Sequence, residues 1–105
     1  MRLAVIGDEM FVRMFELVGA IGFVVKDRAE AKNTLKKLIE KKDFGIIILP
    51  ERFVPDTRDI RDKMIREGAY YPLFIFLPDH TGIKGLRIEE LKKLISMAVG
   101  IELRL

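Results

Sequence analysis

Four short apolar runs alternate along the chain with longer segments in which apolar residues recur at helical spacing. The runs occupy residues 2–6, 22–25, 45–49 and 73–77. They are apolar at almost every position, a pattern typical of parallel strands that are covered on both faces. The helical segments lie near residues 9–18, 28–42, 52–67 and 88–99. Strands and helices that alternate in this way predict an α/β fold.

The alternation predicts a four-stranded parallel sheet. Because each strand–helix–strand unit crosses over in the right-handed sense, we expect the strand order 2-1-3-4, with residues 3–6 and 45–49 in the centre. This is a short doubly wound sheet, Rossmann-like or receiver-like, in which the fifth strand usual in receiver domains is absent. A C-terminal helix is expected after a flexible loop.

Local signals mark the ends of the predicted helices. Asp8 and Asp27 are predicted N-caps, and Glu30 follows Asp27 by three residues, as in a capping box. Pro55 lies inside the start of the third helical segment, where the first helical turn tolerates proline. Three glycines are predicted to end helices in the left-handed conformation: Gly19, Gly68 and Gly100.

The chain divides into one domain and one appended element. Residues 1–78 are expected to form the α/β domain. Residues 79–87 contain Gly82 and Gly85 and have no periodicity, which predicts a flexible loop. Residues 88–105 are then a C-terminal helix and its tail.

Composition narrows the class of protein. The 105 residues suffice for one domain with a core, and the absence of cysteine fits a reducing compartment. The chain begins Met1-Arg2 and enters a strand at once, so no signal peptide is expected. The longest apolar runs are far shorter than the roughly 20 residues that span a bilayer, which argues against direct membrane insertion. The 19 basic and 16 acidic residues are interspersed, a pattern that argues against nucleic-acid binding.

Candidate chemistry lies where the strands end, since ligands of open α/β sheets bind at the carboxyl ends of strands. Asp8 and Glu9 follow the first strand, and Glu51 follows the third; three such carboxylates are hard ligands that Mg²⁺ accepts. The favoured interpretation is that they cap helices or lie in first helical turns. Pro50 stands where a phosphorylatable receiver has its aspartate, and His80 is alone in the predicted loop. We therefore expect no catalytic residue, no cofactor and no metal site.

Two helical segments carry more apolar residues than one buried face needs. In the first segment, Met10 and Leu17 widen the stripe of core residues. In the last segment, the apolar stripe can pack either on its own sheet or against a partner's helices, and both alternatives stay open. The predicted partner-binding residues are Met10, Met14, Leu91, Leu94, Ile95, Ala98, Val99 and Ile101.

Three segments together resemble a known family. They are Leu3-Ala-Val-Ile-Gly-Asp8, Gly45-Ile-Ile-Ile-Leu-Pro-Glu-Arg52 and Glu90-Leu-Lys-Lys-Leu-Ile-Ser-Met-Ala-Val-Gly-Ile-Glu-Leu103. In length and order of elements the chain is similar to the subunit named F of the archaeal A-type and vacuolar-type rotary ATPases. It departs from the family at Pro50-Glu51, where many relatives carry a Thr-Glu or similar pair.

The resemblance implies a non-catalytic rotor subunit of the central stalk that couples ATP turnover to ion transport. It implies binding to the long coiled-coil stalk subunit named D, contact of the C-terminal helix with the catalytic A and B subunits, and a peripheral place at the cytoplasmic face of the membrane. The competing hypothesis is a degenerate receiver-like module that binds a small ligand or another protein, with an anion, a nucleotide or Mg²⁺ at Gly7, Asp8 and Pro50.

Overall fold

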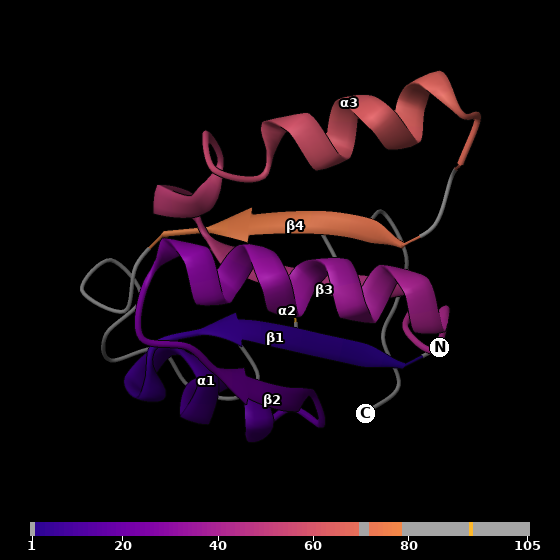
Figure 1. Cartoon of the computed structure of the whole chain (residues 1–105). Helices are drawn as coiled ribbons and strands as arrows, with labels where there is room; N and C mark the ends of the chain where they lie inside the picture. Colours follow the sequence, from indigo (N-terminus) through magenta and orange to yellow (C-terminus); the bar gives the residue numbers. More distant parts are fainter. Residues whose placement is uncertain (1, 70–71, 79–92, 94–105) are drawn as a thin grey trace.

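The computed structural model describes residues 2–69, 72–78 and 93 (Figure 1). Its elements in chain order are β1 (Leu3–Gly7), α1 (Glu9–Glu16), β2 (Ile21–Val24), α2 (Arg28–Lys41), β3 (Ile46–Pro50), the 3-10 turn η1 (Glu51–Phe53), α3 (Arg58–Arg66) and β4 (Leu73–Leu77). The predicted loop 79–87, Gly100 and, apart from Lys93, the predicted helix 88–99 lie outside the described residues.

The four strands form one parallel sheet of order β2-β1-β3-β4, which confirms the predicted topology. Every residue of β1 and of β3 is buried, whereas β2 and β4 at the two edges are partly exposed. A central parallel strand is covered on both faces, and this is why β1 and β3 are apolar throughout.

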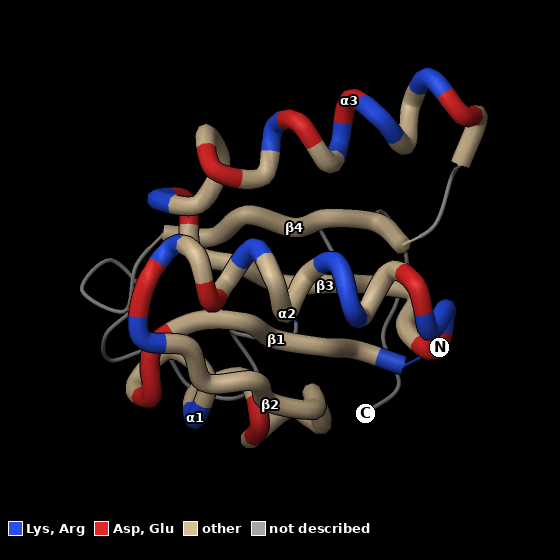
Figure 2. The backbone as a smooth tube through the Cα atoms, viewed as in Figure 1, with Lys and Arg blue, Asp and Glu red and all other residues tan. Residues whose placement is uncertain are grey.

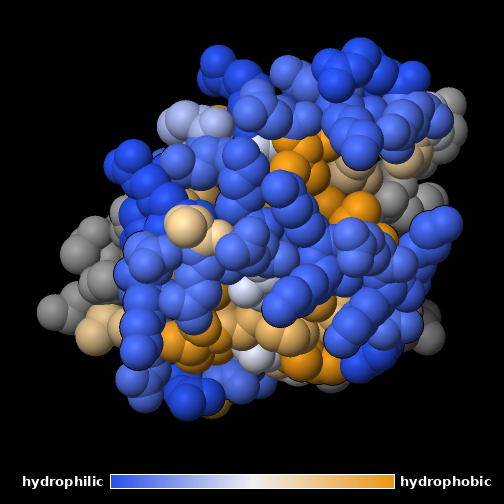
Figure 3. Space-filling view, viewed as in Figure 1, coloured by the Kyte–Doolittle hydropathy of each residue, from blue (hydrophilic) through white to orange (hydrophobic). Residues whose placement is uncertain are grey.

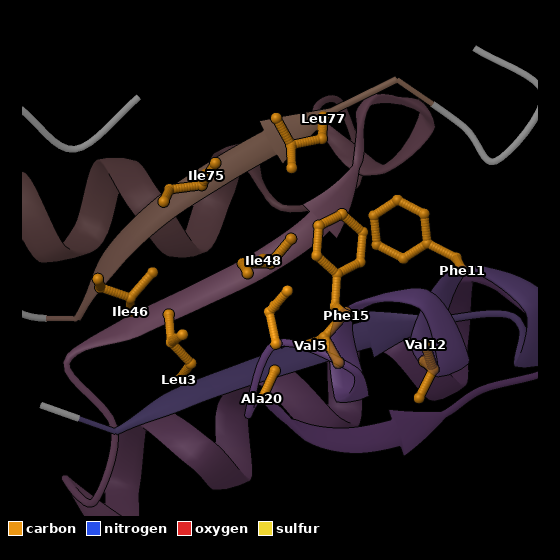
Figure 4. Close-up of a cluster of buried hydrophobic side chains, with 11 residues drawn as sticks. Leu3, Val5, Phe11, Val12, Phe15, Ala20, Ile46, Ile48, Ile75 and Leu77 are labelled. Carbon is orange, nitrogen blue, oxygen red and sulfur yellow. The ribbon is translucent and has the colours of Figure 1, made fainter. Parts of the chain in front are cut away.

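In the part of the chain that the structure describes, helices lie on both faces of the sheet. On one face α1 supplies the helical part of a buried cluster that contains Phe11 and Phe15 (Figure 4). On the other face α2, η1 and α3 contribute to a second cluster with Leu35 and Phe53, and Figure 1 is viewed from this side. We call these the α1 face and the α2–α3 face.

Charged residues lie mainly on the helices, whereas the strands are almost entirely apolar. Figure 2 shows the basic and acidic residues interspersed along the helices and almost absent from the strands. On the α2–α3 face the surface is largely hydrophilic, but apolar side chains show between α2 and α3 (Figure 3), where Ile39, Ile60 and Met64 line a shallow hollow. The interspersed charges of the described helices agree with the mixed surface expected from the sequence.

The predicted N-caps Asp8 and Asp27 and the predicted glycine stops Gly19 and Gly68 are confirmed. Asp8 and Asp27 cap α1 and α2, each accepting a hydrogen bond from a backbone N–H three residues on. Gly19 and Gly68 have φ angles of 96° and 72°, and the backbone N–H groups around them bond back to the preceding helix, as in a Schellman motif. Lys42 ends α2 with a φ of 56°, a left-handed position that its residue type does not signal.

The third helix begins later than predicted. Residues 52–67 were expected to be one helix with Pro55 near its start, but α3 begins at Arg58 and Pro55 lies in the turn before it. Thr57 is fully buried and its hydroxyl donates to the Phe53 carbonyl at 2.9 Å. The Arg61 guanidinium donates to the Val54 carbonyl at 2.6 Å. These side chains bind the carbonyls of Phe53, the last residue of η1, and of Val54 after it, and so hold the segment between η1 and α3.

Candidate functional site

The carboxyl edge of the sheet brings together groups from β1 and from η1. One oxygen of Asp8 accepts the backbone N–H of Phe11 at 2.9 Å, and the other accepts the guanidinium of Arg52 at 3.0 Å. The cap starts α1 and the ion pair ties η1 to the end of β1. Both oxygens of Asp8 therefore accept hydrogen bonds within the fold, and the bond from Phe11 confirms that Asp8 is a helix cap.

Glu9 and Glu51 lie in the first turns of α1 and η1, where the helix dipole favours a carboxylate. Both are exposed. Within the described residues no group of three or more His, Cys, Asp or Glu side chains is close enough to hold a metal ion. The predicted helical interpretation of these acidic residues is confirmed, and His80 lies outside the described residues.

A hollow of about 540 Å³ opens at this edge between the starts of α1, α2 and η1. Its lining is Asp8, Val25, Lys26, Asp27, Arg28, Ala29, Arg52 and Phe53. Asp27 caps α2, and the Glu30 carboxylate returns to the Lys26 N–H at 3.2 Å, one position before the cap residue. The acidic groups around the hollow thus serve the helix starts.

Close packing accounts for the glycine at position 7. It is the last residue of β1, and among the described residues the glycines with positive φ are Gly19 and Gly68. A Cβ at Gly7 would lie 2.8 Å from Cδ1 of Phe11. Glycine is needed here because the Phe11 ring lies against the backbone, and this contact leaves no local signal in the sequence.

The outer side of α1 is the other candidate site. Met10 and Leu17 are 58% and 66% exposed, whereas Met14 is partly buried against the cluster of Phe11 and Phe15. With Glu9 and Arg13, these three residues line an apolar hollow of about 590 Å³, which we call the α1 flank. The predicted residues Met10 and Met14 are therefore together on one surface.

The charges of the α1 flank are paired within the helix. Arg13 donates to the Glu16 carboxylate at 2.6 Å and lies 3.9 Å from that of Glu9. The hydrogen bond to Glu16 raises the pKa of Arg13. The spacing of these residues, i to i+4 and i to i+3, is the sequence signal for such pairs. The flank consequently offers apolar surface beside charges that already have partners.

The other predicted partner-binding residues lie outside the described residues: Leu91, Leu94, Ile95, Ala98, Val99 and Ile101. The pairing of Arg52 with Asp8 has no signal in the sequence, since 44 residues separate the two. In the described part of the chain, no helix is both long enough and apolar enough to cross a membrane.

Comparison with known proteins gives a consistent match. The family model of the ATP synthase (F/14-kDa) subunit matches residues 3–95. In the A-type ATP synthase of Thermococcus onnurineus, the subunit named F is 32% identical, with 99% of each chain covered. That of Methanothermobacter thermautotrophicus is 33% identical over 96% of this chain and 94% of its own. The V-type ATP synthase of Fusobacterium nucleatum has a subunit of the same name that is 29% identical over 94% of this chain and 91% of its own.

Proposed function

The chain belongs to the family of the ATP synthase (F/14-kDa) subunit, and we propose that it is a non-catalytic subunit of the central stalk of an A-type or V-type ATP synthase. In this role it binds the coiled-coil stalk subunit named D, turns with it and couples ATP turnover to ion transport. Residues 88–105 reach toward the catalytic A and B subunits. The subunit sits peripherally, at the cytoplasmic face of the membrane.

The observation that carries the proposal is the exposed apolar surface of the α1 flank. An α-helix that leaves Met10 and Leu17 more than half exposed gains nothing for its own fold from these side chains. Met10, Met14 and Leu17 follow each other by four and three residues, which is the spacing of the apolar seam in a coiled coil. A helix of the coiled-coil stalk subunit is a suitable partner for such a seam.

The carboxyl edge supports the non-catalytic part of the proposal. Chemistry at that edge needs a nucleophile or a base that is available to a substrate. Asp8, the acidic group nearest the end of β1, holds the start of α1 and Arg52 instead. A subunit that acts through its surfaces fits this arrangement.

The test is co-purification with the coiled-coil stalk subunit of the same organism, comparing Leu17→Lys with Ile65→Lys. Both residues are exposed apolar side chains near the C-terminal end of a helix, where lysine is well tolerated, but Ile65 belongs to α3 on the opposite face. We expect Leu17→Lys to weaken binding and Ile65→Lys to leave it unchanged.

Two results would count against the proposal. Failure of the unaltered chain to bind the stalk subunit would refute the stalk role itself. Equal binding by both variants and the unaltered chain would preserve that role but exclude the α1 flank as the contact. Adding the chain to a stalk-containing complex that lacks it should also change ATP turnover, whereas the isolated chain should hydrolyse no ATP.

A further inference from the structure

The outer edge of β4 is an apolar strand edge. Among the described strands β4 is the last in the order β2-β1-β3-β4, and its sequence is Leu-Phe-Ile-Phe-Leu. Strands exposed at the edge of a sheet pair readily with other strands, and proteins usually protect them with a charge, a proline or a covering segment. Neither a charged residue nor a proline lies within β4. A covering segment is the protection that remains.

The backbone groups of Phe74 and Phe76 face this edge. The N–H of Leu73 donates to the Gly45 carbonyl at 2.9 Å, so the backbone of Leu73 is turned toward β3. Successive residues of a strand direct their N–H and C=O groups to opposite sides. Ile75 is therefore turned toward β3 as well, and Phe74 and Phe76 are turned outward. Their N–H and C=O groups are in position to bond to one more strand.

An apolar hollow of about 360 Å³ lies beside the same edge. Residues of α3 and β4 line it, and Figure 1 shows α3 next to β4. Ile65 of α3 is 74% exposed at this hollow, and Leu73 is 39% exposed. Phe74 and Phe76 line it from below and pack against the buried cluster of the α2–α3 face. A strand added to β4 would direct every second side chain to this side of the sheet.

We propose that residues 100–105 of this chain add to β4 as a further strand in the free protein. Their sequence, Gly-Ile-Glu-Leu-Arg-Leu, alternates between apolar and charged residues, the pattern of a strand with one buried face. Ile101, Leu103 and Leu105 then lie on the side of the hollow, where Ile65 is exposed. Six residues of strand span about 20 Å, enough to cover the roughly 17 Å of β4.

The added strand gives the sheet a charged edge. Glu102 and Arg104 lie on it, and charged residues on an outermost strand discourage further pairing. The connection is long enough, because residues 78–87 can extend by about 33–36 Å and a helix over residues 88–99 by about 18 Å. The inference goes beyond the proposed function, since it concerns the free chain, and its failure would leave the stalk role untouched.

The test is amide hydrogen exchange of the full chain, followed by NMR. The amides of Leu73 and Ile75 are bonded to β3 and should be protected in any case. Those of Phe74 and Phe76 should exchange at least about tenfold more slowly than unstructured amides, because only a strand added at the edge can bond them. Exchange of Phe74 and Phe76 at the unstructured rate would overturn the proposal.

The other edge of the sheet supplies an internal control. The N–H of Val25 donates to the Gly7 carbonyl at 2.9 Å, so the amides of Gly22 and Val24 in β2 face outward by the same alternation. We expect these two amides to exchange quickly. Slow exchange of Gly22 and Val24, with fast exchange at β4, would place the added strand on β2 and contradict the proposal.

Two variants identify the occupant. Leu103→Lys puts an ammonium group into the apolar hollow and should remove the protection of Phe74 and Phe76, while Ile75 stays protected and reports that the domain is folded. Glu102→Lys introduces the same side chain on the other side of the strand and should leave the protection unchanged. Protection that survives Leu103→Lys would exclude residues 100–105. Protection that rises with protein concentration would show a second copy at the edge and would overturn the proposal as well.

Discussion

The carboxyl edge of the sheet and the α1 flank use their side chains in opposite ways. At the edge Asp8 and Asp27 are bound to backbone N–H groups, and Asp8 also holds Arg52. On the flank Met10 and Leu17 are more than half exposed, and neither belongs to the buried clusters of the described residues. The edge has the residue types of a reactive site, whereas the flank is largely apolar and its charged residues, Glu9 and Arg13, pair within α1.

The difference shows that residue type alone is a poor guide to function at such an edge. Carboxylates at helix starts are stabilised by the N-terminal dipole and by capping hydrogen bonds, whatever else they do. Large apolar side chains left exposed on a helix gain no such stabilisation. Exposed apolar side chains are therefore the better place to look for function here, and under the proposed function they bind a partner.

The largest expected effect distinguishes the inner side of α1 from its outer side. Phe15 is fully buried and its ring lies 4.8 Å from that of Phe11 between centroids. We expect Phe15→Ala to lower the free energy of unfolding by about 3–5 kcal/mol, because it leaves a cavity in the core. Leu17→Ala, only two residues away, should change it by less than about 0.5 kcal/mol. Urea unfolding followed by circular dichroism measures both, and similar losses would contradict the assignment of the two sides.

A smaller effect tests the structural use of the carboxyl edge. Asp8→Ala removes the cap of α1, and we expect a loss of about 0.5–2 kcal/mol in the free energy of unfolding. Asp8→Asn keeps a capping oxygen and loses the charge that faces Arg52. Since partly exposed ion pairs contribute about 0–1 kcal/mol, this variant should lose less. An Asp8→Ala protein as stable as the unaltered chain would show that the cap is not needed.

The sequence predicted the fold well where a pattern is local or periodic. The apolar runs of β1 and β3 and the caps at Asp8 and Asp27 are examples, because strand burial and helix capping depend on neighbours in the chain. It failed at the start of α3, where the buried hydroxyl of Thr57 binds the Phe53 carbonyl and holds a turn that periodicity does not reveal.

The candidate site was predicted in the same uneven way. The surplus of apolar residues at Met10 and Leu17 follows from helical spacing alone. The Asp8–Arg52 pair forms because β1 and β3 are neighbours in the sheet. Likewise, Val12 of α1 can lie close to β2 because Gly22 has no Cβ. Contacts of this kind arise only when the chain has folded, so a single sequence carries no sign of them.

Partner binding through the α1 flank should respond weakly to salt. The flank is apolar, and Arg13 is paired with Glu16 and Glu9 of its own helix. We expect the affinity for the stalk subunit to fall less than about tenfold between low and moderate salt, because each surface ion pair contributes only about 0–1 kcal/mol. Titration calorimetry at several salt concentrations measures this. A loss of several orders of magnitude would mean that charges dominate the interface.

At the carboxyl edge we expect no effect at all: neither binding of Mg²⁺ nor phosphorylation by acetyl phosphate. Both oxygens of Asp8 are engaged, and Pro50, the last residue of β3, offers no carboxylate beside it. We expect no phosphate to be incorporated and no specific shift of the Asp8 and Glu9 amide signals as Mg²⁺ is added in an NMR titration. Saturable shifts at these two residues, absent from Asp8→Asn, would mean that the edge binds a cation in spite of its structural contacts. The receiver-like alternative would then be favoured, and the carboxyl edge would be a binding site as well as a structural element.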